Sequence, residues 1–384
     1  MQGKPLLHNL QSKKVMEYDF YVYQCALSKI FANRFDAGRR LLERFSSVYE
    51  IFSMGEAALR ELMPGGEQYI NEILNPANLE WAQAEVDWAA SCGIELLTLG
   101  STLYPQRLKD CPDAPLVLYS RGGADLNAQH VVGVVGTRRS SYGGRENCRK
   151  IIAKLAENPI KPLIVSGLAL GIDGVAHISS LDMGLQTVAV MPTGLDEIYP
   201  SRHRELADRI LAEGSSLVTD FPRATTPMTY TFARRNRIIA GLSDAVLLAE
   251  SYVPGGGLIT ARLASSYNRE VFAVPGRMSD PSYEGCNKLI SENVAHIVHD
   301  TDTIEKEMGW KPSRRRKRGQ VLFHDDDTPA KKAVLEMLRQ RAPQTLEEIV
   351  REVGCSMREL APELLELEMD GRICKDRHFY YLCM

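Results

Sequence analysis

Seven short runs of mainly Val, Ile, Leu and Ala between residues 131 and 300 constrain the fold of this chain more than any other feature. A segment long enough for an amphipathic helix separates most of them. Such runs are typical of parallel strands that helices cover on both faces. They lie at Val131–Val135, Leu163–Ser166, Thr187–Met191, Ser216–Thr219, Ala245–Ala249, Val271–Val274 and Ala295–Val298. We therefore predict an α/β fold with an extended Rossmann-like parallel sheet as its core.

A helical pattern precedes this core. Apolar residues at spacings of three and four predict helices over Tyr18–Ile30, Asp36–Phe45, Gly55–Leu62 and Asn78–Cys92. The segment Phe31–Phe45 resembles the second half of a helix-hairpin-helix, although the expected glycine-rich hairpin is absent from it. We predict a small N-terminal helical domain over 1–94, of the SAM or helix-hairpin-helix kind, before a core over 95–310.

The last sixty residues predict three helices and a hairpin, the pattern of a winged helix over 328–384. The helices are expected over Pro329–Arg341, Thr345–Val353 and Ser356–Asp370, and the hairpin over Arg372–Leu382. Ser356 and Glu359 have the spacing of a capping box. The third helix carries four glutamates and an aspartate against Arg358 alone, which favours contact with protein over contact with DNA.

The residues between core and winged helix, 311–327, predict a linker. They combine a basic run from Arg314 to Arg318 with three aspartates at 325–327 and offer little to bury. The basic run is either a tether that touches DNA or a solvated spacer.

Net charge limits the kind of nucleic-acid site that this chain can carry. The whole chain has a net charge of −3, which argues against a protein that coats duplex DNA through overall positive charge. Residues 131–300 hold 18 basic and 17 acidic side chains, whereas residues 321–384 hold 9 and 13. Any phosphate-binding site must therefore be local, and the core is the better candidate.

The expected location of the protein in the cell is inferred from features that the sequence lacks. The first twenty residues contain no apolar run, and no later stretch is apolar for the eighteen residues that a membrane span needs. The eight cysteines are scattered, without a CxxC pair or a Cys/His cluster at zinc spacing. We expect reduced thiols, no metal, no cofactor, no membrane contact and a cytoplasmic location.

Small residues and arginines gather where the predicted strands end. Parallel strands bring their carboxyl ends to one edge, where ligands of open α/β sheets bind. Glycines at a strand–helix turn expose amides to an anion, and arginines match phosphate oxygens. The candidate residues are Gly136, Thr137, Arg138, Arg139, Ser166, Gly167, Arg202, Arg235, Asn236, Arg237, Gly256 and Gly257. We predict a crest that binds anions, without a catalytic residue.

Four polar residues in succession, Arg234 to Arg237, would cover nearly a whole helical turn. At least one of these arginines should therefore face a pocket or an anion. Asp173 and His177, four residues apart on a predicted helix, could form an acid/base pair or half of a metal site. With no third ligand in view, a structural role for this pair is the favoured interpretation.

The order of these motifs resembles the DprA/Smf family. The resemblance rests on Tyr104-Pro-Gln-Arg-Leu, Gly136-Thr-Arg, Ser166-Gly-Leu-Ala-Leu-Gly-Ile-Asp, Tyr199-Pro200, Arg235-Asn-Arg-Ile-Ile-Ala-Gly-Leu-Ser243, Gly257-Leu-Ile-Thr-Ala261 and Val274-Pro-Gly276. It implies a homodimer that binds single-stranded DNA without sequence preference and loads the RecA recombinase in natural transformation. Arg138 and the Arg235–Arg237 group match the family's phosphate-contacting positions.

The chain departs from the family pattern in three places. Leu170 stands where many members have Lys, His203 where Asn is common, and Gly255-Gly256 where Ser-Gly is frequent. The first departure removes one expected phosphate contact.

An enzyme is the alternative interpretation. Pro254-Gly-Gly-Gly, with Glu250 and Thr260 nearby, resembles the glycine loop of nucleotide phosphoribohydrolases. In those enzymes the catalytic glutamate follows the loop within a few residues. Here no acidic residue follows until Glu270, so the sequence favours binding over hydrolysis.

Overall fold

The structure, a computed structural model, describes residues 19–310, 327–341, 344–370, 372–376 and 379–382. The chain divides after Trp310 into two compact units. No helix in these ranges is long and apolar enough to cross a membrane.

The first unit is built on a sheet of nine described strands in the order β1-β2-β6-β5-β4-β3-β7-β8-β9. All seven predicted runs form strands, and these seven pair in parallel. They are β3 (Val131–Val135), β4 (Leu163–Ser166), β5 (Thr187–Val190), β6 (Ser216–Thr219), β7 (Ala245–Leu248), β8 (Glu270–Ala273) and β9 (His296–Ile297). The predicted Rossmann-like sheet is confirmed.

Two antiparallel strands that the apolar runs did not indicate extend one edge of this sheet. β1 (Glu95–Thr98) pairs with β2 (Val117–Gly122), and β2 pairs with β6. β2 begins buried and ends exposed at Arg121 and Gly122, so it lacks the continuous burial of the parallel strands.

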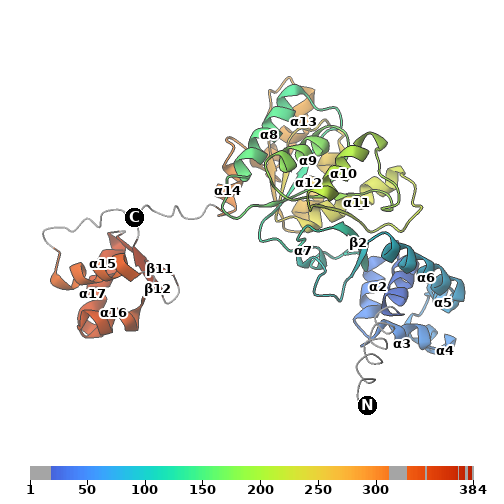
Figure 1. Ribbon diagram of the computed structural model, residues 1–384, viewed down its shortest axis with the longest axis horizontal. Coiled ribbons are helices and arrows are strands. Elements are labelled where there is room, and N and C mark those ends of the chain that lie inside the picture. The colour runs from blue at the N-terminus through green and yellow to red at the C-terminus, as the bar shows by residue number, and fades with distance from the viewer. Residues whose placement is uncertain (1–18, 311–326, 342–343, 371, 377–378, 383–384) are drawn as a thin grey trace, which may run out of the picture. The chain divides into compact units, whose positions relative to one another are not determined.

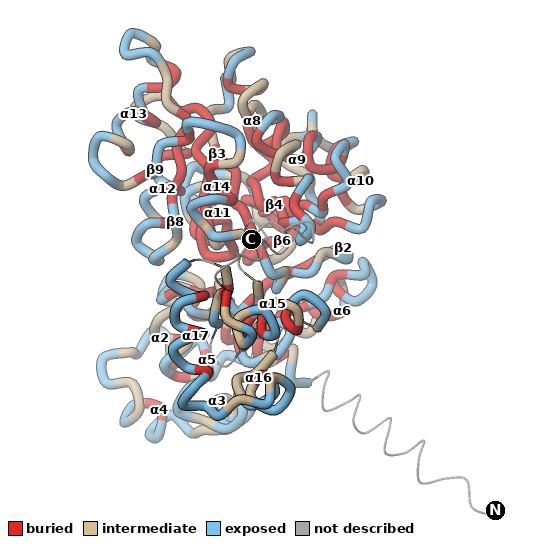
Figure 2. Tube along the Cα trace, turned by 90° about the vertical axis from the view of Figure 1, so that its left-hand side faces the viewer, coloured by how far each residue is buried: buried red, intermediate tan, exposed pale blue. Residues whose placement is uncertain are grey.

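Helices connect the strands of the sheet, in the segments between the apolar runs. They are α7 (Gln106–Lys109), α8 (Tyr142–Leu155), α9 (Ile172–Asp182), α10 (Arg204–Ala212), α11 (Thr229–Leu242), α12 (Gly256–Ser266), α13 (Glu284–Ser291) and α14 (Thr303–Glu307). Figure 2 shows that the buried part of this unit lies in the strands and in the helix faces turned toward them. The strands are therefore shielded from water, which explains their apolar composition.

The N-terminal helices share their core with the sheet. They run over 19–30, α2 (Phe35–Leu42), α3 (Val48–Ser53), α4 (Glu56–Leu62), α5 (Glu67–Leu74) and α6 (Pro76–Ser91), and Figure 1 shows α2–α6 gathered on the side of β2. Phe31, Ile51 and Ile70 belong to the same continuous hydrophobic core as Val132 and Leu247. These helices thus belong to the first compact unit.

A buried ion-pair cluster fixes helix α11 against the end of β6. Asp220 accepts hydrogen bonds from Arg234 Nη2 at 2.8 Å and from Arg237 Nη2 at 2.5 Å. Burial pushes the pKa of Asp220 upward, but Arg237 and Arg234 outweigh it and hold the pKa below its usual range. The ring of Phe35 lies 4.0 Å from the Arg237 guanidinium and 4.7 Å from that of Arg234. The cluster therefore joins α2, β6 and α11.

The last residue of the first unit is anchored at the amino-terminal edge of the sheet. The Trp310 ring contacts His130, which directly precedes β3, with ring centroids 4.4 Å apart. Asn158 Nδ2 donates to the Trp310 carbonyl at 3.1 Å and to Glu305 Oε1 at 2.7 Å. The chain thus leaves this unit from a fixed point.

The second unit has its own core and the elements of a winged helix. They are α15 (Pro329–Arg341), β10 (Gln344–Thr345), α16 (Leu346–Val353), α17 (Met357–Met369), β11 (Ile373–Asp376) and β12 (Phe379–Leu382), with a sheet in the order β10-β12-β11. The predicted capping box is confirmed, because the Ser356 amide and hydroxyl both donate to Glu359. The predicted basic run of the linker lies outside the described residues.

Most described cysteines agree with the expectation of free thiols. Six are free, at positions 25, 92, 111, 148, 286 and 355. Cys374 is disulfide-bonded, so the expectation that all thiols are reduced is wrong at this position.

Replacing Asp220 by Asn should destabilise the first unit strongly. The change leaves two arginines without their buried partner, and breaking a buried pair in this way costs about 3 kcal/mol. Urea unfolding of the variant would measure the loss. Asp182→Asn is the matched control, since Asp182 pairs with Arg209 at the surface and its loss should stay below about 1 kcal/mol.

The same cluster predicts a pH dependence. Because folding lowers the pKa of Asp220, its contribution is fully present above the unfolded-state pKa of about 4 and is lost as pH falls through the folded value. The stability advantage of the wild-type protein over Asp220→Asn should therefore shrink below about pH 4. An equal difference at every pH would show that Asp220 does not titrate with folding.

Candidate functional site

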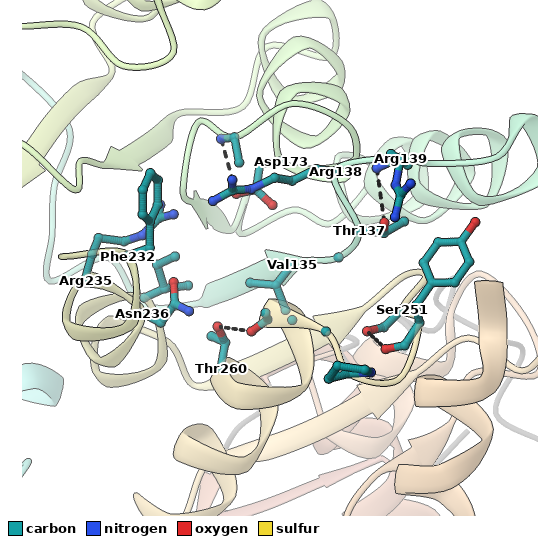
Figure 3. A pocket seen from close by; sticks show the side chains of 18 residues that line it. Val135, Thr137, Arg138, Arg139, Asp173, Phe232, Arg235, Asn236, Ser251 and Thr260 are labelled. Atoms are coloured by element: carbon teal, nitrogen blue, oxygen red, sulfur yellow. Dashed lines mark hydrogen bonds between the residues drawn. The ribbon is translucent and has the colours of Figure 1, made fainter. Parts of the chain in front are cut away.

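A cavity of about 370 Å³ opens at the carboxyl edge of the parallel strands, where the loops after β3 and β7 diverge. β3 pairs with both β4 and β7, so the strand order reverses at this point, the usual ligand position in such sheets. Figure 3 shows side chains from these loops and from α11 converging on it. The lining residues are Val135, Gly136, Thr137, Arg138, Arg139, Ala169, Asp173, Phe232, Arg235, Asn236, Ile239, Ser251, Tyr252, Pro254, Gly255, Gly256, Gly257 and Thr260.

Arg138 and Arg139 form the exposed rim of this cavity. The Arg138 guanidinium lies 4.6 Å from the centre of the Phe232 ring, and Phe232 in turn packs edge-to-face on Tyr199. The Arg139 guanidinium lies 6.0 Å from the Tyr252 ring. A cation held over an aromatic face keeps its charge and its N–H donors available. The rim therefore presents two guanidinium groups to an anion.

Arg235 forms the floor of the cavity. Its side chain is 3 % exposed, and Nη1 donates to the Val190 carbonyl at 2.7 Å. Burial lowers the pKa of Arg235 to about 10, with Asp173 acting in the opposite direction. Arg235 is therefore still positively charged at neutral pH. Its buried Nε has no acceptor among the described residues, and such a donor is costly to leave unpaired.

Asp173 lies beside this floor and accepts a hydrogen bond from the Ala169 amide at 3.4 Å. Burial raises its pKa, while Arg235 opposes the rise. Asp173 is the one acidic residue among those that line the cavity. The opposite charges of Asp173 and Arg235 therefore each favour the ionised form of the other.

Of two helix N-termini near the cavity, one is already occupied. The Glu250 carboxylate accepts hydrogen bonds from the Ser141 amide at 3.1 and 2.9 Å and lies against Gly144, in the first turn of α8. The amino-terminal turn of α8, where an anion could otherwise bind, is therefore filled by the protein's own carboxylate. The amides of Gly256 and Gly257, in the first turn of α12, have no acceptor among the described residues and border the cavity.

The glycines of the cavity allow close packing of its loops. A Cβ on Gly257 would lie 3.3 Å from the Gly136 Cα, and a Cβ on Gly136 would lie 2.6 Å from Ile172. Larger residues at either position would force the β3 and β7 loops apart.

The structure brings eight of the twelve predicted site residues to the cavity. They are Gly136, Thr137, Arg138, Arg139, Arg235, Asn236, Gly256 and Gly257. The other four do not line it. Ser166 donates to the Val134 carbonyl, Gly167 packs against Arg235, Arg202 is exposed on the turn Ser201–His203, and Arg237 is held by Asp220.

Helical spacing explains the division of the arginines on α11. Phe232, Arg235 and Asn236 share one face and line the cavity, while Arg234 and Arg237 lie on another and bind Asp220. The prediction that one of these arginines faces a pocket or an anion is confirmed. Sequence reasoning missed Phe232, although its position three residues before Arg235 could have indicated it.

Asp173 and His177 have separate hydrogen-bond partners in the structure. His177 is buried, its Nδ1 lies 2.8 Å from Thr187 Oγ1, and burial lowers its pKa to about 3. It is therefore neutral at physiological pH and has a structural role. His203, one of the three departures from the family pattern, lies with Nδ1 2.8 Å from the Leu168 carbonyl. No group of three or more potential metal ligands occurs in the part of the chain that the structure describes.

Residues 95–309 match the family described as DNA recombination-mediator protein A. The chain belongs to this family. Residues 324–376 also match the DprA winged helix domain, which confirms the interpretation of the second unit. The family match spans the sheet, and with it every residue of the cavity.

Individual relatives agree with this membership. Protein Smf of Escherichia coli is 33% identical over 76% of this chain and 78% of its own length. The structure of DNA processing protein A from Streptococcus pneumoniae is similar with a TM-score of 0.55, at 32% identity over 67% of this chain and 95% of that one.

A second solved structure, of DNA processing protein A from Helicobacter pylori, concerns its single-stranded-DNA-binding mode. It matches with a TM-score of 0.50, at 25% identity over 56% of this chain and 95% of that one. These structures match the Rossmann-like fold of this DprA-family chain.

Gly167→Ala should destabilise this DprA-family protein by disturbing the cavity floor. The new Cβ would lie 1.7 Å from Arg235 Nη1, so the guanidinium must give up its bond to the Val190 carbonyl. Overpacking of this kind costs about 1–3 kcal/mol, measurable by urea unfolding. In Gly143→Ala the Cβ meets nothing closer than 3.8 Å, so that control should unfold at or above the wild-type urea midpoint.

Proposed function

We propose that this chain binds single-stranded DNA at the cavity between the β3 and β7 loops, without sequence preference. The observation that carries the proposal is the pairing of an exposed Arg138 guanidinium on Phe232 with the positively charged Arg235 below it. The open amides of Gly256 and Gly257 add donors on the opposite wall. Together they form a binding surface for phosphate oxygens, with an aromatic ring beside it.

Loops at a sheet edge suit a flexible strand better than a duplex. They can follow the backbone of a single strand, but they offer no helix to the major groove. Contacts to phosphates carry no base information, so binding should be independent of sequence. The Helicobacter pylori relative, whose structure concerns single-stranded DNA binding, supports this choice of ligand.

The placement of the two acidic side chains near the cavity supports a binding protein rather than an enzyme. Glu250, the carboxylate nearest in sequence to the glycine loop, is held by the Ser141 amide, and Asp173 lies beside Arg235. Neither is placed like the catalytic glutamate of a phosphoribohydrolase, which follows its glycine loop. Incubation with nucleoside monophosphates tests the alternative, and release of free base would overturn the non-enzymatic assignment.

We further propose the finer role that family membership suggests. The protein would act in the cytoplasm as a homodimer, protect incoming DNA in natural transformation and load the RecA recombinase onto it. Relatives named DNA processing protein DprA in Streptococcus pneumoniae and Bacillus subtilis support the link to DNA processing. Strand-exchange assays with purified recombinase, with and without this protein, would test the loading step.

Arg138→Gln should weaken binding of a fluorescent single-stranded oligonucleotide about tenfold, because a charge-assisted phosphate contact contributes about 1–3 kcal/mol. Wild-type affinity should fall with rising salt and should exceed that for duplex of the same sequence. Arg149→Gln is the matched control, an exposed arginine on α8 outside the cavity. Equal affinity of both variants would place the DNA elsewhere.

Removal of residues 321–384 should leave single-strand affinity within about threefold of wild type, since their net negative charge opposes phosphate binding. They hold 9 basic and 13 acidic side chains. Fluorescence anisotropy on the truncated protein measures this. A large loss of affinity in a folded truncated protein would instead make the winged helix a DNA-binding domain, contrary to the protein-contact role proposed for it.

A further inference from the structure

The N-terminal helices enclose a second cavity of about 370 Å³, outside the region that the DNA recombination-mediator family match covers. Residues of α2 and of the turn between α4 and α5 line it. They include Arg34, Arg40 and Arg44 on one side and Gly65, Gly66 and Tyr69 on the other.

The lining of this second cavity is positively charged. It contains three arginines and no acidic residue. Asp36 pairs with Arg34 at 3.4 Å and with Arg40 at 2.8 Å, and all three side chains are exposed. One carboxylate cannot neutralise three guanidinium groups, and exposed ion pairs of this kind contribute little. Arg44 has no ion-pair partner among the described residues, so the cavity offers net positive charge to a ligand.

The opposite wall supplies backbone donors and an aromatic surface. Residues 63–66 join α4 to α5 in a turn that the Gly66 amide closes on the Met63 carbonyl at 2.9 Å. Gly65 has a φ of +78° with open space around its α-carbon, and its amide has no acceptor among the described residues. Beside it, the Tyr69 ring stacks on Phe31 at 4.8 Å and 9°.

The second cavity lies beside the elements that carry the first. Arg34 directly precedes Phe35, whose ring packs against Arg234 and Arg237 of α11. The same helix presents Arg235 and Phe232 to the cavity at the sheet edge. α11 therefore contacts the start of α2 on one face and lines the first cavity with another.

We propose that the arginine-lined cavity binds a backbone phosphate of DNA, so that a strand longer than the first cavity can hold also contacts the N-terminal helices. The guanidinium groups and the Gly65 amide would hold the phosphate, and the Tyr69 ring would contact the adjoining sugar or base. That the bound phosphate belongs to DNA rests on the proposed function. That the second cavity binds a phosphate at all rests on its own lining residues.

The test compares a short and a long oligonucleotide on the full-length protein carrying Arg40→Gln and Arg44→Gln together. Of two fluorescent oligothymidylates, the one of about 6 nucleotides lies within the 4–16 nucleotides that one single-strand site commonly covers, and the one of about 30 nucleotides exceeds it. Affinity for the long oligonucleotide should fall about fivefold or more, and the slope of log K against log salt should decrease by about 0.7, the value for one lost phosphate contact on a single strand. Affinity for the short one should not change.

Arg60→Gln is the matched control, an exposed arginine of α4 that pairs with Glu56 outside the cavity. It should bind both oligonucleotides like wild type. Unchanged affinity and salt slope of the double variant for the long oligonucleotide would overturn the proposal. If the double variant fails to fold by circular dichroism, Arg44→Gln alone replaces it, and a smaller loss of affinity for the long oligonucleotide is then expected.

Failure of the two proposals can be told apart. Arg138→Gln should weaken binding of both oligonucleotides, whereas the double variant affects the long one only. Normal binding by Arg138→Gln with weakened long-strand binding by the double variant would contradict the first site and support the second.

Discussion

The placement of helix α11 depends on Asp220. This carboxylate, buried at the end of β6, draws Arg234 and Arg237 to one face of the helix. These two ion pairs determine the rotation of α11 about its axis. The rotation in turn points Phe232, Arg235 and Asn236 toward the cavity. The cavity floor and the aromatic support of Arg138 both follow. A charge that contacts no ligand thus sets the geometry of the groups that would contact one.

Local charge matters more here than total charge. The chain is slightly acidic, and its core is almost neutral. Yet Arg138, Arg139 and Arg235 converge on one cavity that Asp173 alone opposes. Burial strengthens the contribution of Arg235, because the field of a charge extends further where water is excluded.

Much of the fold could be predicted from the sequence, because strands buried on both faces must be apolar throughout. The antiparallel strands β1 and β2 escaped this argument, since β2 ends in the exposed residues Arg121 and Gly122. Eight of the twelve candidate site residues line the cavity, since strand-end glycines and arginines mark the edge of a parallel sheet. The ion pair of Arg237 could not be predicted, because its partner Asp220 lies seventeen residues away in sequence. Likewise, nothing in the glycine-rich sequence after β3 indicates that Glu250 fills the first turn of α8.

The anchoring of Trp310 has a consequence for how the two units cooperate. Because His130 and Asn158 hold the end of the first unit beside the start of β3, the connecting segment begins at the edge of the sheet away from the cavity. A longer or shorter connection would then alter the effective concentration of the winged helix near its partners without changing the residues that line the cavity. Evolution, or an engineer, can therefore tune the reach of the second unit independently of the affinity of the first.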